Sequence, residues 1–248
     1  MADETLTIEA PQGLSQFERV VDVFIAPTAT FKDILRSTSW WLPFLLSTIA
    51  ILGMAFTIDR KVGFEQVAET QIQINPTSAS QMSSLPPAAQ AAQMQKIAVG
   101  YRYFTYASPL VVLLFAALAS LVLWASFNFG LAARTTFAQI FCLWMFANLP
   151  RLLSAVITIV TLCFGSSPET FNLQQPAGTN IGYYVSDAAP WLENLLSYFD
   201  VVTIWAMVLL ILGGSIVARV KIGQAAAIVI GWWLLGVLVS VAATAAFT

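Results

Sequence analysis

Long apolar runs separated by polar connections dominate this chain. A helix needs about 20 residues, at roughly 1.5 Å each, to cross a hydrocarbon core of about 30 Å. Trp40 and Trp41 open the first such run where an aromatic belt is expected, and Pro43 falls in its first turn, where a missing N–H costs little. The pattern predicts five transmembrane helices, over residues 40–58, 109–129, 137–164, 200–217 and 225–247.

Two short amphipathic helices are predicted ahead of the first run, over residues 15–36, after a flexible tail at residues 1–13. Ser15 and Glu18 have the spacing of a capping box, and Pro27 marks the boundary between the two helices. Amphipathic helices next to a membrane span are expected to lie in the headgroup region or to form a docking surface for a partner.

The first amphipathic helix is expected to have one apolar and one charged face, because its apolar residues recur at helical spacing. The apolar face consists of Phe17, Val20, Val21 and Phe24. The charged residues expected to point away from it are Glu18, Arg19 and Asp22.

The connections between the runs are polar. Residues 59–107 are predicted to be a helical loop outside the membrane, and residues 165–199 a second outer loop. The longer loop is rich in Gln, Ser, Ala and Pro and has too few apolar residues to build a core of its own. Residues 14–247 are therefore expected to form one membrane domain.

The third apolar run carries polar residues in its middle. Residues 137–164 include Asn148, Pro150 and Arg151. Proline removes a backbone hydrogen bond, so this helix is predicted to break near residue 150. An arginine in a membrane costs at least ~2.5 kcal/mol on insertion scales, which makes Arg151 the strongest local signal in the sequence.

Arg151 can reach the depth of Asp200 if the third span enters the membrane from the cytoplasmic side. The two residues are therefore a candidate intramembrane polar pair. Such a pair can lock the third and fourth spans together, or it can line a pathway for an ion, a proton or a lipid headgroup.

The fifth span carries small residues at spacings of four, a pattern that allows close approach of helices. The candidate packing face consists of Ala227, Gly231, Gly236 and Ser240. It can serve packing inside the bundle or form a homodimer.

Composition narrows the class of protein. Hydrophobic residues make up 58% of the 248 residues and charged residues 10%, compared with about 25% in an average soluble domain. So few charges cannot cover a soluble domain, and the chain is too hydrophobic to be disordered. The absence of histidine excludes Ser-His-Asp and Cys-His catalysis and histidine-ligated metals. We expect no catalytic residues, no cofactor-binding residues, no metal ligands and, at a net charge of −2, no nucleic-acid partner.

Charge asymmetry predicts the orientation in the membrane. With the N-terminus inside, the inner segments hold six basic residues and the outer segments four. The positive-inside rule therefore predicts a cytoplasmic N-terminus. Cys142 and Cys163 lie about 30 Å apart if their segment is one helix, too far for a disulfide, and are predicted to be small apolar fillers.

This pattern resembles the Yip1 domain family over roughly residues 15–247. The N-terminal and central positions that carry the resemblance are Ala26, Pro27, Phe31, Ile34, Trp40, Trp41, Pro43, Phe137, Gln139, Asn148, Leu149 and Pro150. The C-terminal block consists of Leu195, Leu196, Asp200, Ile204, Trp205, Gly213, Gly214, Ala225 and Ala226.

The resemblance implies five spans, a cytosolic N-terminus and no enzymatic activity. The chain lacks the Asp-Leu-Tyr-Gly-Pro element of the eukaryotic members and has a short N-terminal tail, so it looks more like the prokaryotic branch. We therefore expect a multi-pass protein of the bacterial inner membrane and do not carry over the binding of Rab GTPases.

Two functions are consistent with this sequence. The first is a non-enzymatic scaffold or membrane-organising protein, whose partners are membrane lipids and either a protein at the cytoplasmic face or further copies of the chain. The alternative is a transporter or channel subunit that uses the polar region around Arg151 and Asp200.

Overall fold

The computed structural model describes residues 13–165, 171–185 and 188–247. These residues form helices and no strand, with one isolated backbone bridge between Asn180 and Asp200. The predicted tail lies almost wholly outside the described residues, as do parts of the second outer loop.

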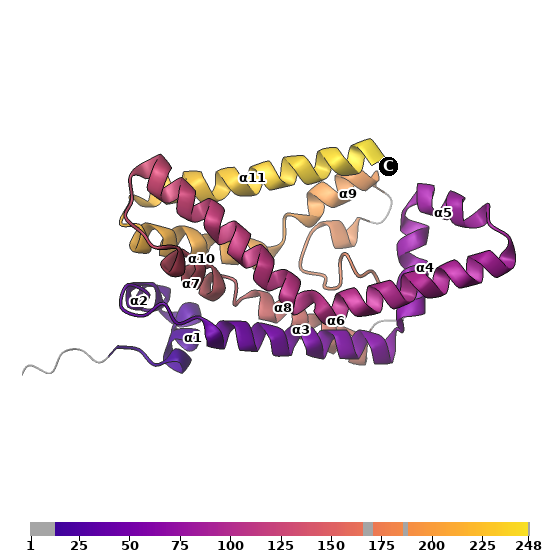
Figure 1. Cartoon of the computed structure of the whole chain (residues 1–248), viewed down its shortest axis with the longest axis horizontal. Coiled ribbons are helices and arrows are strands. Elements are labelled where there is room, and N and C mark those ends of the chain that lie inside the picture. The colour runs from indigo at the N-terminus through magenta and orange to yellow at the C-terminus, as the bar shows by residue number, and fades with distance from the viewer. Residues whose placement is uncertain (1–12, 166–170, 186–187, 248) are drawn as a thin grey trace, which may run out of the picture.

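Four helices in the described part of the chain are long and apolar enough to cross a membrane. They are α3 (Trp41–Lys61), α6 (Pro87–Ala125) with the π-helical turn after it (Ser126–Gly130), the α7–α8 pair (Phe137–Ala147 and Arg151–Phe164), and α11 (Ile222–Phe247). A fifth apolar helix, α10 (Val201–Val217), has 17 residues, the lower limit for a span of about 17. The predicted all-α, polytopic membrane bundle is confirmed, with α3 and α11 running along its long axis (Figure 1).

An N-terminal hairpin, defined here as α1 (Gln16–Ile25) and α2 (Pro27–Asp33), packs against the end of the bundle where α3 begins. Figure 1 shows α2 nearly end-on while α3 lies across the view, so α2 crosses the bundle axis. Phe31 and Ile34 at its C-terminal end are fully buried against the helices of the main core. The second amphipathic helix is therefore a part of the bundle rather than only a surface element.

Gly213 lets the hairpin approach α10. A Cβ atom at Gly213 would overlap Leu143 of α7 and would lie 3.0 Å from the ring of Phe31. The neighbouring Gly214 faces Phe127, whose ring would lie 2.9 Å from a Cβ atom there. Gly213 thus lies where α2 and α7 meet α10, and both glycines face residues of the main core.

The third apolar run is the most buried of the four long spans, because 56% of an apolar 18-residue stretch within it is buried inside the bundle. Its first half, α7, supplies more residues to the main core than any other helix, and α1, α2, α6, α10 and α11 supply the others together with Phe127 and Leu149. The central members of this core are Phe31, Phe127, Ile140, Leu143, Phe146 and Leu149.

Residues 59–107 are mostly helical. They contain α4 (Phe64–Ile74) and α5 (Pro76–Ser83) and the first turns of α6. Their apolar residues do not form a core alone, and residues of α3, of α8 and of the loop after α8 complete a second core with them. Its buried members are Ile58, Phe64, Val67, Ala68, Ala98, Leu162 and Phe171.

Helix α6 is continuous across the predicted boundary between outer loop and second span. Pro109 lies inside it and is buried. The hydroxyl of Ser108 donates to the carbonyl of Thr105 at 2.7 Å, which satisfies the acceptor that the proline leaves without its usual N–H partner. The 39 residues of α6 extend for roughly 58 Å, so the helix projects well beyond the hydrocarbon core.

Side-chain amides tie the two predicted outer loops to each other and to α11. The amide group of Gln71 in α4 donates to Asn172 at 3.1 Å and accepts from Gln174 at 3.0 Å. The short helix α9 (Pro190–Ser197) packs on α11, where Asn194 donates to the hydroxyl of Ser240 at 3.1 Å. These bonds fix the end of the molecule opposite the N-terminal hairpin.

Candidate functional site

The break in the third span is built around Asn148. Helix α7 ends at Ala147 and α8 begins at Arg151. The Asn148 amide donates to the carbonyl of Trp144 at 2.9 Å and its oxygen accepts from Nε of Arg151 at 3.0 Å. Asn148 thus satisfies one backbone acceptor at the break and one donor of the charged side chain.

Arg151 and Asp200, the candidate polar pair, form no direct ion pair. Among the described residues, the salt bridges do not include them. Asp200 caps α10, where its Oδ2 accepts from the backbone N–H of Thr203 at 2.7 Å. Its Oδ1 is buried and has no hydrogen-bond partner within the described structure.

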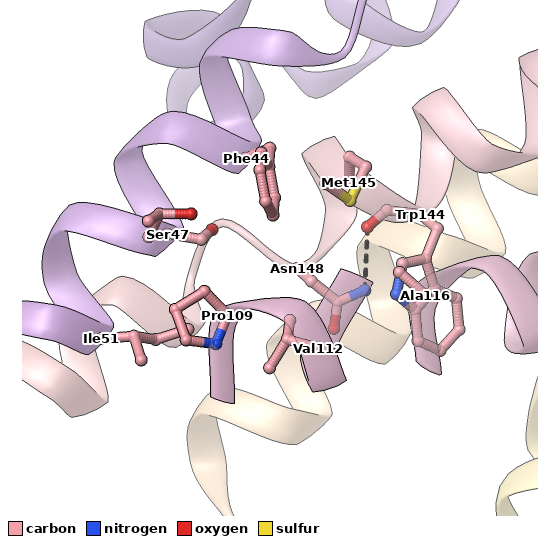
Figure 2. A pocket seen from close by; sticks show the side chains of 10 residues that line it. Phe44, Ser47, Ile51, Pro109, Val112, Ala116, Trp144, Met145 and Asn148 are labelled. Carbon is pink, nitrogen blue, oxygen red and sulfur yellow. Dashed lines mark hydrogen bonds between the residues drawn. The ribbon is translucent and has the colours of Figure 1, made fainter. Parts of the chain in front are cut away.

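A small cavity lies next to the break, between α3, α6 and α7. Figure 2 shows Ser47 of α3, Pro109 of α6 and Asn148 around it. Its volume of about 40 Å³ has room for a few water molecules and is far below the about 300–1,000 Å³ of ordinary ligand pockets. The hydroxyl of Thr48 at its wall is buried without a partner. In this conformation the cavity can hold water but not a solute of drug size.

The four small residues of α11 do not share one face. At roughly 100° per residue, Gly236 and Ser240 lie on the side of the helix away from Ala227 and Gly231. A Cβ atom at Gly231 or Gly236 would meet nothing within 4 Å. Ser240, by contrast, accepts a hydrogen bond from Asn194 of α9. The close helix approach inside the bundle takes place at Gly213 and Gly214 of α10 instead.

Arg19 of α1 is a buried charged residue with several polar contacts. The expectation that its side chain points away from the apolar face of α1 was wrong. The residue is fully buried. Its guanidinium donates to the carbonyl of Ser39 at 3.1 Å, to that of Ser37 at 3.0 Å and to the thiol of Cys142 at 3.4 Å. It also lies 4.5 Å from the ring centroid of Phe146. We call Arg19 and these contacts the Arg19 anchor.

The anchor joins four parts of the chain. Nε of Arg19 lies 3.5 Å from a carboxylate oxygen of Asp33 in α2, and the hydroxyl of Thr30 donates to the Arg19 carbonyl at 3.0 Å. Asp33 is also held by Arg36, with bonds of 2.7 and 3.1 Å. The side-chain hydrogen bond to Asp33 raises the pKa of Arg36 above its usual value. Helices α1, α2 and α7 and the connector before α3 are thus fixed to one another.

Cys142 has a polar role in addition to packing. Besides accepting from Arg19, its thiol donates to the Ser39 carbonyl at 3.5 Å. Both cysteines are free, Cys142 buried and Cys163 exposed. The prediction that the two form no disulfide is confirmed.

The predicted capping box at the start of α1 is confirmed. The Ser15 hydroxyl accepts from the backbone N–H of Glu18 at 3.2 Å, and the Glu18 carboxylate accepts from the backbone N–H of Ser15 at 2.7 Å. These bonds hold the pKa of Glu18 below its usual value of 4.5.

The predicted apolar face of α1 divides in two. Val20 and Phe24 pack against the main core, near the fully buried Val23. Phe17, Val21 and Ile25 are 73%, 42% and 75% exposed and follow one another at intervals of four along the helix. These three residues, called here the α1 stripe, form an apolar row that no other part of the described structure covers.

The comparisons with known proteins give one match. The described residues contain no group of three or more Cys, Asp or Glu that could hold a metal ion. No curated protein and no solved structure matches the chain. The family model described as Yip1 domain matches residues 21–243, which include the Asn148 break, Asp200 and most of the N-terminal hairpin. Together with the apolar helices, this match over nearly the whole chain makes the protein an integral membrane protein that belongs to the Yip1 domain family.

Proposed function

We propose that the protein is a non-enzymatic scaffold that organises the membrane, inserted in a bacterial inner membrane with its N-terminus in the cytoplasm. The observation that carries the proposal is the Arg19 anchor, which holds the N-terminal hairpin rigidly while the α1 stripe stays uncovered. A rigid apolar row at the end of a membrane bundle is suited to entering one leaflet at a fixed position.

The hairpin has the features of an interfacial element. Helix α2 crosses the bundle axis where α3 begins, so the hairpin lies at the level of one headgroup region (Figure 1). Full burial of a Phe or Ile side chain is worth about 1.5–3 kcal/mol, so placing Phe17 and Ile25 among acyl chains is favourable. An element that enters one leaflet only is sensitive to curvature and lipid composition, which gives the chain a way to sort or shape membrane.

The orientation follows from the basic residues. Lys32 lies on the hairpin and Arg36 directly after it, and Arg219 and Lys221 lie in the turn between α10 and α11. Arg134 precedes α7 on the same side of the bundle. The positive-inside rule assigns this side to the cytoplasm, where a protein partner or a second copy can also reach the hairpin.

Vesicle partition tests the scaffold proposal. We expect the purified protein to enrich in small, highly curved vesicles over large ones. The double variant Phe17→Gln, Ile25→Gln should lose that preference, because it removes the apolar row. Thr28→Gln, an exposed change on the same hairpin, is the matched control and should keep it. Equal partition of the wild-type protein between small and large vesicles would contradict the proposal.

A transporter or channel subunit is the alternative, and the unpartnered Oδ1 of Asp200 is the observation that favours it. Asp200→Asn separates the two functions, because asparagine keeps the helix cap and removes the negative charge of the carboxylate. A transport role predicts loss of solute flux in proteoliposomes with normal folding. The scaffold role predicts no solute flux in the wild-type protein or in Asp200→Asn, and the same preference for curved vesicles in both.

A further inference from the structure

A polar cleft lies at the end of the bundle away from the N-terminal hairpin, between the last turn of α3 and the outer part of α6. It has a volume of about 330 Å³ and opens to the surface. Its lining is Phe56, Asp59, Arg60, Arg102 and Tyr106. Two arginines and one carboxylate give it a net positive charge.

Asp59 organises one side of the cleft. One oxygen of its carboxylate accepts from the Tyr106 hydroxyl at 3.1 Å and lies 3.2 Å from a terminal guanidinium nitrogen of Arg102. This pairing fixes the position of Arg102 but occupies few of the five N–H donors of its guanidinium. The Arg102 side chain stays 60% exposed, so the remaining donors are accessible from the cleft.

Arg60 supplies the second cation and has no acceptor of its own in the described structure. Its guanidinium lies 5.3 Å from the ring centroid of Phe56, a cation–π contact that leaves the N–H groups unused. A guanidinium with open donors matches the oxygen pairs of a phosphate group. The cleft therefore presents two cations and a fixed tyrosine to an anionic ligand.

The position of the cleft indicates where that anion comes from. Leu45, Ile49, Leu52 and Phe56 are exposed, lie on the same side of α3 as Arg60, and lead along the span up to it. An exposed apolar row on a spanning helix faces acyl chains, and a basic side chain at its end reaches the headgroup level. A ligand that fits both the basic cleft and the apolar row carries a phosphate at one end and acyl chains at the other.

We propose that the Arg60–Arg102 cleft binds the phosphate of an anionic phospholipid in the leaflet opposite the N-terminal hairpin. Arg60 and Arg102 pair with the phosphate oxygens, and Asp59 and Tyr106 hold Arg102 in place. The acyl chains lie along the exposed row of α3. This site is independent of the scaffold proposal, because it lies at the other end of the spans.

Native mass spectrometry of the full chain released from nanodiscs tests the site. The probe is phosphatidylglycerol in a phosphatidylcholine background, with bound lipid counted per protein. We expect retained phosphatidylglycerol in the wild-type protein and about tenfold weaker retention in Arg60→Gln and in Arg102→Gln. Lys221→Gln, an exposed cation at the other end of the bundle, is the matched control and should retain the lipid as the wild type does.

Two further results decide between sources of the anion and between local and global effects. Inorganic phosphate at millimolar concentration should not displace the lipid, because it lacks the acyl chains; displacement would overturn the assignment to a phospholipid. Thermal unfolding of both arginine variants should match that of Lys221→Gln. Equal lipid retention by the folded Arg60→Gln and Arg102→Gln variants and the wild type would overturn the proposal.

Discussion

Replacing Arg19 by methionine tests how the N-terminal hairpin is held. Methionine fills a similar volume and donates no hydrogen bond. Asp33 keeps its two bonds to Arg36, so no buried carboxylate is left unpaired. The loss falls on the acceptors of the Arg19 anchor, which are the carbonyls of Ser37 and Ser39 and the Cys142 thiol.

The magnitude follows from those acceptors. A buried carbonyl left without a donor costs about 1–3 kcal/mol, and this cost falls on the Ser37 carbonyl. The Ser39 carbonyl keeps only the weak thiol donor of Cys142. With the lost cation–π contact to Phe146, the destabilisation is roughly 3 kcal/mol. At about 1.4 kcal/mol for each factor of ten, docking of the hairpin weakens roughly 100-fold. The thiol adds little, because it is a weak acceptor.

Hydrogen–deuterium exchange in nanodiscs measures this change. Backbone amides of α1 and α2 should exchange roughly 100 times faster in Arg19→Met, while amides of α8 and α11 keep the wild-type rate. Lys32→Met is the matched control, because Lys32 is an exposed cation on the same hairpin. Unchanged exchange in α1 and α2, or uniform acceleration throughout the bundle, would refute the reasoning.

Two further predictions concern packing and pH. Gly213→Ala should destabilise the bundle by about 1–3 kcal/mol, because the added methyl group overlaps Leu143. Gly231→Ala has open space around it and should be tolerated or slightly stabilising. Thermal unfolding in detergent compares the two variants, and equal shifts in unfolding temperature would contradict this packing. Glu18 has a lowered pKa in the folded protein, so its contribution to α1 is present above pH 4.5 and is lost as pH falls through the folded pKa. Exchange at the first turn of α1 should accelerate over that acidic range in the wild type but not in Glu18→Gln.

Periodicity and length were sufficient to predict the spans because each span depends on local sequence. The capping box and the break near residue 150 depend on neighbours in the chain, and both are present in the structure. Membership of the Yip1 domain family was likewise visible in residues spread over the whole chain.

Residues whose environment is set by distant segments were not predictable in the same way. Arg19 has the spacing of a surface charge, and its partners Ser37, Ser39 and Cys142 are separated from it by 18 to 123 residues. The only local signal was that Arg19 shares a helix face with the buried Val23. An apolar residue one helical turn away is too weak a signal to predict that an arginine is buried.

The packing role of glycines within the bundle depends on distant segments in the same way. Spacings of four in α11 predict a packing face, yet a Cβ atom at Gly231 or Gly236 would meet nothing within 4 Å inside the chain, so that face stays a prediction for contact with a second copy. The adjacent pair Gly213 and Gly214 has no such spacing and is where the helices meet. Which glycine is needed depends on the bulk opposite it, here Leu143 and Phe127, and that information lies in other helices.

Cysteine accessibility tests the central claim, a membrane-spanning bundle with the N-terminal hairpin in the cytoplasm. Gln81→Cys in α5 and Gly223→Cys at the start of α11 are exposed, and a Cys142→Ser, Cys163→Ala background removes the native thiols. In intact cells an impermeant maleimide should label Gln81→Cys only, and Gly223→Cys should react only after the membrane is opened. Labelling of both residues from the same side would contradict the account.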